Sequence, residues 1–129
     1  MALTLLMVDD EAELGKLICR VAEDVGFAAR STTTARDFLS AMDEGEPDLV
    51  ILDLGLPEMD GVELMRVLAE RGTRAEVLIM SGSDTRVRHS ANRLGEARGL
   101  QMAGQVAKPL RVAQLREVLG AARDRLAAR

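Results

Sequence analysis

Residues 49–61 read LVILDLGLPEMDG, and this stretch decides the fold class. Its first four residues are apolar without interruption, which is typical of a strand that other elements cover on both faces. Asp53 follows the strand directly, and the glycines and proline after it predict a loop. In α/β sheets ligands bind beyond the carboxyl ends of the strands, so Asp53 stands where such a sheet is expected to carry a functional residue.

Short apolar runs alternate with longer helical patterns on both sides of this segment. Further strands are predicted at residues 3–8, 27–32, 77–80 and 101–107. Helices are predicted at residues 11–25, from an N-cap at Thr34 through residue 42, at residues 62–71 and 84–98, and from residue 112 onward. Strands that alternate with helices predict a doubly wound α/β fold, in which helices cover both faces of a parallel sheet.

The composition is that of one globular domain, which we expect to span residues 1–129. Hydrophobic residues make up 47% of the chain and charged residues 29%, a balance that argues against disorder. The net charge is −4, and with no Trp, no Tyr and two Phe the chain offers almost no aromatic side chains on which bases could stack. We therefore expect no nucleic-acid binding by this chain alone.

The chain also lacks the marks of an exported or membrane protein. Its first residues, MALTLLMVDDE, have neither the basic leader of a signal peptide nor the length of a membrane span. The one cysteine, Cys19, fits a reducing compartment. We expect a cytoplasmic protein without membrane contacts.

Polar side chains follow four of the predicted strands. Asp9 and Asp10 end the first strand, Asp53 the third, Ser81 the fourth and Lys108 the fifth. Because the carboxyl ends of parallel strands meet at one edge of a sheet, we expect these groups to lie together. Three neighbouring carboxylates repel one another unless a cation lies among them, and Mg²⁺ is the natural occupant of an all-oxygen site.

The hydroxyl and the ammonium predicted beside that ion suit a phosphoryl group in transit. The charge of such a group spreads over three equatorial oxygens, which hydrogen-bond donors and cations stabilise. A carboxylate can act as the nucleophile and form an acyl phosphate, and an ionised carboxylate needs no general base. The sequence therefore predicts phosphoryl transfer to a carboxylate.

Four short motifs, in this order and each at a strand end, resemble the receiver domains of two-component response regulators, the CheY-like family. They are DD at 9–10, DLGLPEMDG at 53–61, MSGSD at 80–84 and AKPL at 107–110. The resemblance covers essentially the whole chain. It implies a flavodoxin-like sheet with strand order 2-1-3-4-5 in a bacterial signalling protein.

The resemblance also implies a metal site. Asp10 would bind Mg²⁺ directly and Asp9 largely through water. The carboxylate of Asp53 and the backbone carbonyl of Gly55 would complete the protein ligands.

A role in phosphoryl transfer is implied for three residues of the same edge. Asp53 would take a phosphoryl group from a histidine kinase or a histidine phosphotransfer protein and lose it by slow self-dephosphorylation. Lys108 would pair with the phosphoryl group, and Ser81 would hydrogen-bond it. Such a protein catalyses its own modification and does not turn over an external substrate. Pro57 and Gly61 would shape the loop after the acceptor, and the bond between Lys108 and Pro109 would be cis.

Some positions depart from the family pattern. Gln105 stands where receivers commonly carry Tyr or Phe, which argues against a ring-flip switch and against the usual output surface. Gly82 and Gly55 leave the site open to water, which favours a short-lived phosphoryl group. The alternative function is a receiver-like protein-interaction module that works without phosphorylation. A phosphohydrolase of the haloacid dehalogenase type would require a DxD motif on the first strand, which this chain lacks.

Overall fold

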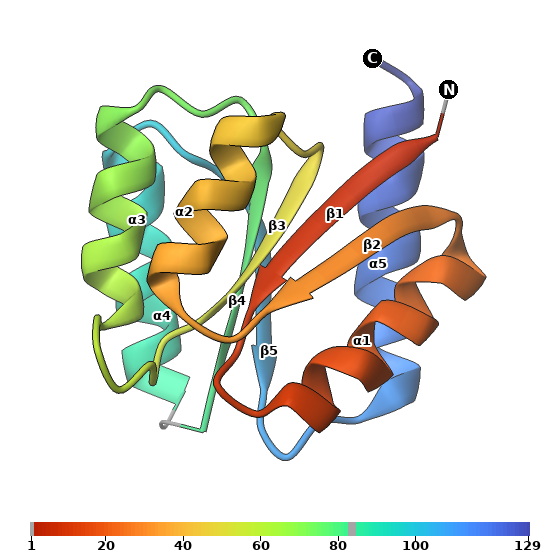
Figure 1. Cartoon of the computed structure of the whole chain (residues 1–129), viewed down its shortest axis with the longest axis horizontal. Helices are drawn as coiled ribbons and strands as arrows, with labels where there is room; N and C mark the ends of the chain where they lie inside the picture. The colour runs from red at the N-terminus through yellow and green to blue at the C-terminus, as the bar shows by residue number, and fades with distance from the viewer. Residues whose placement is uncertain (1, 83–84) are drawn as a thin grey trace.

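Five parallel strands form one sheet in the computed structural model, which describes residues 2–82 and 85–129 (Figure 1). The strand order is β2-β1-β3-β4-β5, as the resemblance implied. The strands are β1 (Leu3–Val8), β2 (Phe27–Thr32), β3 (Leu49–Asp53), β4 (Glu76–Ser81) and β5 (Gln101–Ala107). The positions of β1, β2 and β5 agree with the sequence prediction to the residue, and β3 and β4 are longer by one and two residues.

Helices cover both faces of this sheet (Figure 1). They are α1 (Ala12–Val25), α2 (Ala35–Glu44), α3 (Gly61–Glu70), α4 (Thr85–Ala97) and α5 (Val112–Ala127). One face packs against α1 and α5, and the other against α2, α3 and α4. The predicted start of α4 at Asp84 and the end of the MSGSD motif lie outside the described residues. Among the residues described, no helix is both long enough and apolar enough to cross a bilayer.

Two hydrophobic clusters, one on each face of the sheet, form the core. All five residues of β3 are buried, as expected of a central parallel strand. Met65 and Met80 are fully buried, so methionines fill core positions in this chain with few aromatic residues. In α3 the helical pattern of the sequence predicts that Leu64, Val67 and Leu68 face inward; Leu64 and Leu68 are buried, whereas Val67 is only partly buried.

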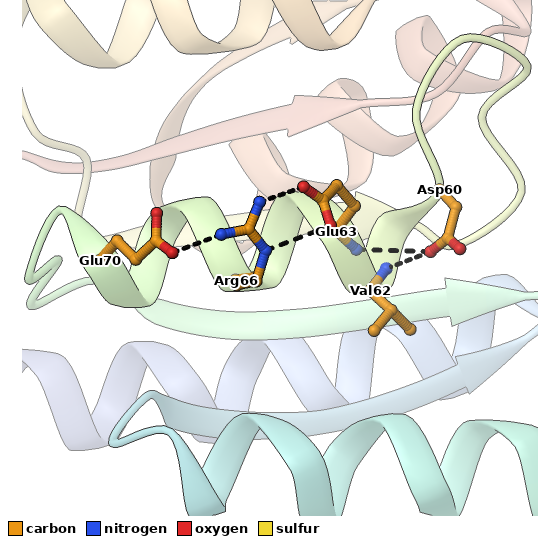
Figure 2. A network of polar contacts seen from close by, with 5 residues as sticks. All are labelled: Asp60, Val62, Glu63, Arg66 and Glu70. Carbon is orange, nitrogen blue, oxygen red and sulfur yellow. Dashed lines mark hydrogen bonds and ion pairs between the residues drawn. The ribbon is translucent and has the colours of Figure 1, made fainter.

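Local sequence signals explain where several helices begin and end. Thr34 caps α2 as predicted, and its Oγ1 accepts a hydrogen bond from the backbone N–H of Asp37 at 3.1 Å. Asp60 caps α3 in the same way, and its Oδ1 accepts hydrogen bonds from the backbone N–H groups of Val62 and Glu63 (Figure 2). Gly26 ends α1 with a φ of 114°, a conformation that favours glycine.

The edge strand β5 contains a bulge. The pairing with β4 steps from Val77–Met102 to Leu78–Gly104, so Ala103 is the extra residue. The φ of Gly104 is 127°. Because the bulge inserts one residue, it reverses the face to which every later side chain of β5 points, and Gln105 pairs in register with Ile79.

Candidate functional site

Three carboxylates meet at the carboxyl edge of the sheet. Asp9 and Asp10 follow β1, and Asp53 is the last residue of the neighbouring strand β3. One oxygen from each of the three side chains lies within 4.8 Å of the others. Asp9 and Asp53 are buried, whereas Asp10 is exposed. The sequence prediction that these carboxylates converge is therefore confirmed.

Lys108 brings a positive charge into this cluster from the end of β5. Its Nζ lies 2.9 Å from Oδ2 of Asp9 and 3.3 Å from Oδ2 of Asp53. The ammonium approaches Oδ2 of Asp9 outside hydrogen-bonding geometry, so this contact is an ion pair. A single ammonium thus faces two buried carboxylates, and the group of four side chains keeps an excess of negative charge.

The surroundings of Asp53 and Lys108 shift their proton affinities. Burial raises the pKa of Asp53 above its ordinary value, and the charge of Asp9 adds to this effect. The hydrogen bond from the N–H of Gly55 and the charge of the Lys108 ammonium lower the pKa of Asp53, but by less than burial and Asp9 raise it. Burial lowers the pKa of Lys108, but the carboxylates of Asp9 and Asp53 outweigh burial and leave this pKa raised. Lys108 is therefore charged at neutral pH.

Backbone hydrogen bonds hold the strand ends in place. Oδ1 of Asp53 accepts from the N–H of Gly55 at 3.0 Å, and Oδ1 of Asp9 accepts from the N–H of Glu11 at 2.9 Å. The N–H of Lys108 donates to the carbonyl of Ser81 at 3.0 Å. Ser81 is buried at the end of β4 and pairs with Ala107, the residue before Lys108. The Ser81 hydroxyl and the Lys108 ammonium therefore come from the ends of adjacent strands, as the sequence predicted.

The donor set suits a hard divalent cation. Carboxylate oxygens are the ligands that Mg²⁺ prefers, and three of them converge here. The buried Oδ2 of Asp9 accepts no hydrogen bond among the described residues, which leaves its lone pairs available to a cation. The residues present therefore fit a magnesium ion.

Comparison with known proteins identifies the family. The sequence model of the response regulator receiver domain matches residues 5–120. The chain belongs to this family. It is thus a receiver domain of two-component signalling, and its doubly wound sheet is the CheY-like fold.

Relatives of this receiver domain include longer bacterial regulators. It is 35% identical over 81 residues to the transcriptional regulatory protein BasR of Escherichia coli, covering 63% of this chain and 36% of BasR. It is 36% identical over 81 residues to the DNA-binding response regulator MtrA of Mycobacterium tuberculosis, with the same two coverages. The chain spans about a third of the length of the curated relatives it matches.

Solved structures agree over nearly the whole chain. A response regulator from Colwellia psychrerythraea is 30% identical, with a TM-score of 0.84 over 97% of this chain and 99% of that chain. The receiver domain of NtrX from Brucella abortus is 25% identical, with a TM-score of 0.77 over 93% of this chain and 98% of that chain. Both support the fold.

Two polar contacts near this edge were not predicted from the sequence. Nε2 of Gln105 lies 3.2 Å from Nδ1 of His89, so the residue in the usual aromatic position contacts α4. The Glu58 carboxylate, in the loop after Asp53, accepts a hydrogen bond from the N–H of Ala35 on α2. Neither contact has a local sequence signal, because each joins residues from separate elements.

The bond between Lys108 and Pro109 is cis, as the resemblance implied.

Proposed function

We propose that this receiver domain accepts a phosphoryl group on Asp53 in a Mg²⁺-dependent reaction. The observation that carries the proposal is the meeting of Asp9, Asp10 and Asp53 within 4.8 Å, with the Lys108 ammonium 3.3 Å from Asp53. This arrangement combines a nucleophile, a cation site and a positive charge for the transferred group. The donor is a histidine kinase or a histidine phosphotransfer protein.

In the proposed reaction, an ionised carboxylate oxygen of Asp53 forms a new bond to phosphorus while the bond from phosphorus to the donor breaks. No proton leaves Asp53, so no general base is required. Lys108 pairs with the phosphoryl oxygens, and the Ser81 hydroxyl donates a hydrogen bond to them. The raised pKa of Asp53 disfavours its ionised form, so a cation in the acidic cluster would favour the nucleophile.

Asp9, Asp10 and Asp53 would hold the metal, together with the backbone carbonyl of Gly55. A bound Mg²⁺ supplies positive charge to the phosphoryl oxygens and offsets the repulsion among the carboxylates. The acyl phosphate is then lost by self-dephosphorylation. Gly55 and Gly82 are exposed and carry no side chain to exclude water from Asp53, which favours a short phosphoryl lifetime.

The modified domain would signal to an output domain or to a partner protein in the cytoplasm. We propose that the chain itself contacts neither nucleic acid nor membrane. Its net charge of −4 and its two aromatic residues offer little to a polyanion or to stacked bases.

The proposal is tested by intact-mass measurement after incubation with acetyl phosphate. We expect one phosphoryl adduct on the parent chain in Mg²⁺, and none when the metal is chelated. Asp53→Asn keeps the size of the side chain and is expected to take no adduct. If the parent remains unmodified and also fails to bind beryllofluoride, phosphoryl acceptance is excluded.

That outcome would favour the second candidate, a receiver-like interaction module that works without phosphorylation. The observation in its favour is Gln105, which has no ring to move and instead contacts His89 on α4. A module of this kind would bind its partner equally well with and without acetyl phosphate.

A further inference from the structure

Glu58, in the loop after Asp53, makes a hydrogen bond to the helix α2, which lies earlier in the sequence. Oε1 of Glu58 accepts a hydrogen bond of 2.8 Å from the N–H of Ala35, the first residue of α2. Ala35 is 2% exposed, so its N–H has little access to water. A carboxylate that accepts from a helix amino end makes a charge-assisted hydrogen bond and interacts favourably with the helix dipole.

The amino end of α2 is in turn held against β1. Oγ1 of Thr32, at the end of β2, donates to the carbonyl of Met7 at 2.7 Å. The carbonyl of Thr32 accepts from the N–H of Asp9 at 3.1 Å. Thr32 lies three residues before Ala35, so Glu58 contacts a segment that is already fixed to the strand that carries the first acidic residues.

The strand order gives this contact its significance. Since β1 lies between β2 and β3, the contact runs from the loop after β3, past the end of β1, to the segment after β2. The amino end of α2 and this loop lie next to each other (Figure 1). On its other side the loop is held to β4 by a hydrogen bond from Leu54 N–H to the Met80 carbonyl at 2.9 Å. A hydrogen bond from Gly61 N–H to the Leu54 carbonyl at 3.2 Å joins the two ends of the loop.

We propose that Glu58 is a positioning residue of the acidic site. By joining the loop to the amino end of α2, it fixes Asp53 and Gly55 relative to the acidic residues that follow β1. Glu58 acts through the loop that follows Asp53 and contains Gly55. The inference rests on the proposed function, because the geometry it preserves is that of a Mg²⁺ site.

Replacement of Glu58 by alanine leaves the buried N–H of Ala35 without its acceptor and frees the loop on the side of β1. We expect Mg²⁺ to bind the Glu58→Ala chain on the order of tenfold more weakly than the parent, the scale on which supporting groups affect metal sites. Glu58→Gln keeps a side-chain oxygen that can accept from Ala35 and removes the charge. We expect Glu58→Gln to bind Mg²⁺ within about twofold of the parent.

Thr34→Ala is the matched control for damage to α2. It removes the other side-chain cap of the same helix, the hydrogen bond to the N–H of Asp37, and leaves the loop untouched. If a weakened helix were the cause, Thr34→Ala would lower the Mg²⁺ affinity as much as Glu58→Ala does. We expect it to lower thermal stability and to leave the affinity unchanged.

The measurement is a Mg²⁺ titration of the full ¹⁵N-labelled chain and of the three variants, followed by amide chemical shifts. The Ala35 amide proton reports the hydrogen bond itself, and we expect it to shift upfield in Glu58→Ala alone. Equal Mg²⁺ affinity in Glu58→Ala and the parent would overturn the inference and leave the proposed function intact. An equal loss of Mg²⁺ affinity in Glu58→Ala and Glu58→Gln would show that the charge of Glu58 matters and its hydrogen bond to Ala35 does not, which would also overturn the inference. Failure of the parent to bind Mg²⁺ would count against both proposals.

Discussion

The ammonium of Lys108 lies 2.9 Å from Oδ2 of Asp9. Asp9 is 1% exposed, so this ion pair lies where water screens it poorly. The same ammonium is 3.3 Å from Asp53. In the absence of a metal, Lys108 is therefore the nearest cation to two carboxylates of the site, and a divalent ion would share these carboxylates with it.

Replacement of Lys108 is expected to change metal binding and phosphoryl transfer in opposite directions. Lys108→Met removes a positive charge from the cluster, so we expect tighter Mg²⁺ binding by amide-shift titration, since like charges repel. We also expect phosphorylation by acetyl phosphate to slow about a hundredfold, the usual effect of losing one electrostatic stabiliser. Lys16→Met removes the other lysine, an exposed residue paired with Glu13 on α1, and is expected to change neither property. Unchanged phosphorylation in Lys108→Met would disprove the role given to this residue.

Asp53→Asn is expected to stabilise the fold at neutral pH. The pKa of Asp53 is raised in the folded state, chiefly by burial, so the folded chain binds this proton more tightly than the unfolded chain does. The resulting stability is fully present below the unfolded pKa, about 3.9, and is lost as pH rises through the folded pKa. At pH 7 the ionised side chain therefore lowers the free energy of unfolding, and asparagine removes this effect.

Urea unfolding followed by circular dichroism between pH 4 and pH 7 measures the difference. We expect Asp53→Asn to be more stable than the parent at pH 7 without divalent ions, and the advantage to shrink toward pH 4. Added Mg²⁺ is expected to stabilise the parent more than the variant. A variant that is less stable than the parent at pH 7 would show that the ionised carboxylate is favourable in the folded state.

A side chain at position 55 is expected to lengthen the phosphoryl lifetime. A Cβ on Gly55 would lie 3.6 Å from Oδ1 of Asp53, an ordinary contact, so a longer side chain there can cover the acceptor. Because exclusion of water slows hydrolysis of a reactive intermediate, Gly55→Met should lose its phosphoryl adduct several-fold more slowly than the parent. Gly120→Met, placed in open space on α5, serves as the control. Equal decay in both variants and the parent would remove Gly55 as a determinant of lifetime.

An ion pair with a buried carboxylate lies at the opposite edge of the sheet, and we expect it to affect stability without affecting phosphorylation. Glu76, 4% exposed at the start of β4, is 2.7 Å from Nη2 of Arg125 and 3.6 Å from Nη2 of Arg129. Removing one partner of a fully buried pair costs about 3–5 kcal/mol. Since the Arg125 side chain is 48% exposed and Arg129 remains, we expect Arg125→Ala to cost about 1–3 kcal/mol.

The matched control for this pair is Arg30→Ala. Arg30 pairs with Glu44 at 2.7 Å, but both side chains are more than half exposed. Its loss should change the free energy of unfolding by less than about 0.5 kcal/mol. Both variants should accept phosphoryl groups as the parent does. Equal stability losses in the two variants would mean that the burial of Glu76 is unimportant.

The strands and the acidic cluster could be predicted from the sequence because both have local signals. The apolar run 3–8 ends at Asp9, and the run 49–52 ends at Asp53, so each strand end is visible in the sequence. Parallel pairing then requires the two ends to meet at one edge. The neighbourhood of the two strand ends follows from the strand order, in which β1 and β3 are adjacent.

Other features depend on contacts that no local pattern records. Glu58 reads as one of many exposed acidic residues, and its role follows only from its contact with Ala35. Glu76 precedes an apolar run and shows no sign that α5 will bring Arg125 to it. The bulge at Ala103 depends on pairing with β4, and it decides which face of the sheet Gln105 reaches.

If Asp53 carries the phosphoryl group, reduction with borohydride will mark this residue chemically. Borohydride converts an aspartyl phosphate to homoserine and leaves free carboxylates unchanged. After incubation of the parent chain with acetyl phosphate and Mg²⁺, we expect peptide mass sequencing to find homoserine at position 53, and aspartate there when the metal is chelated. Homoserine at Asp9 or Asp10, or unmodified aspartate at all three positions, would contradict it.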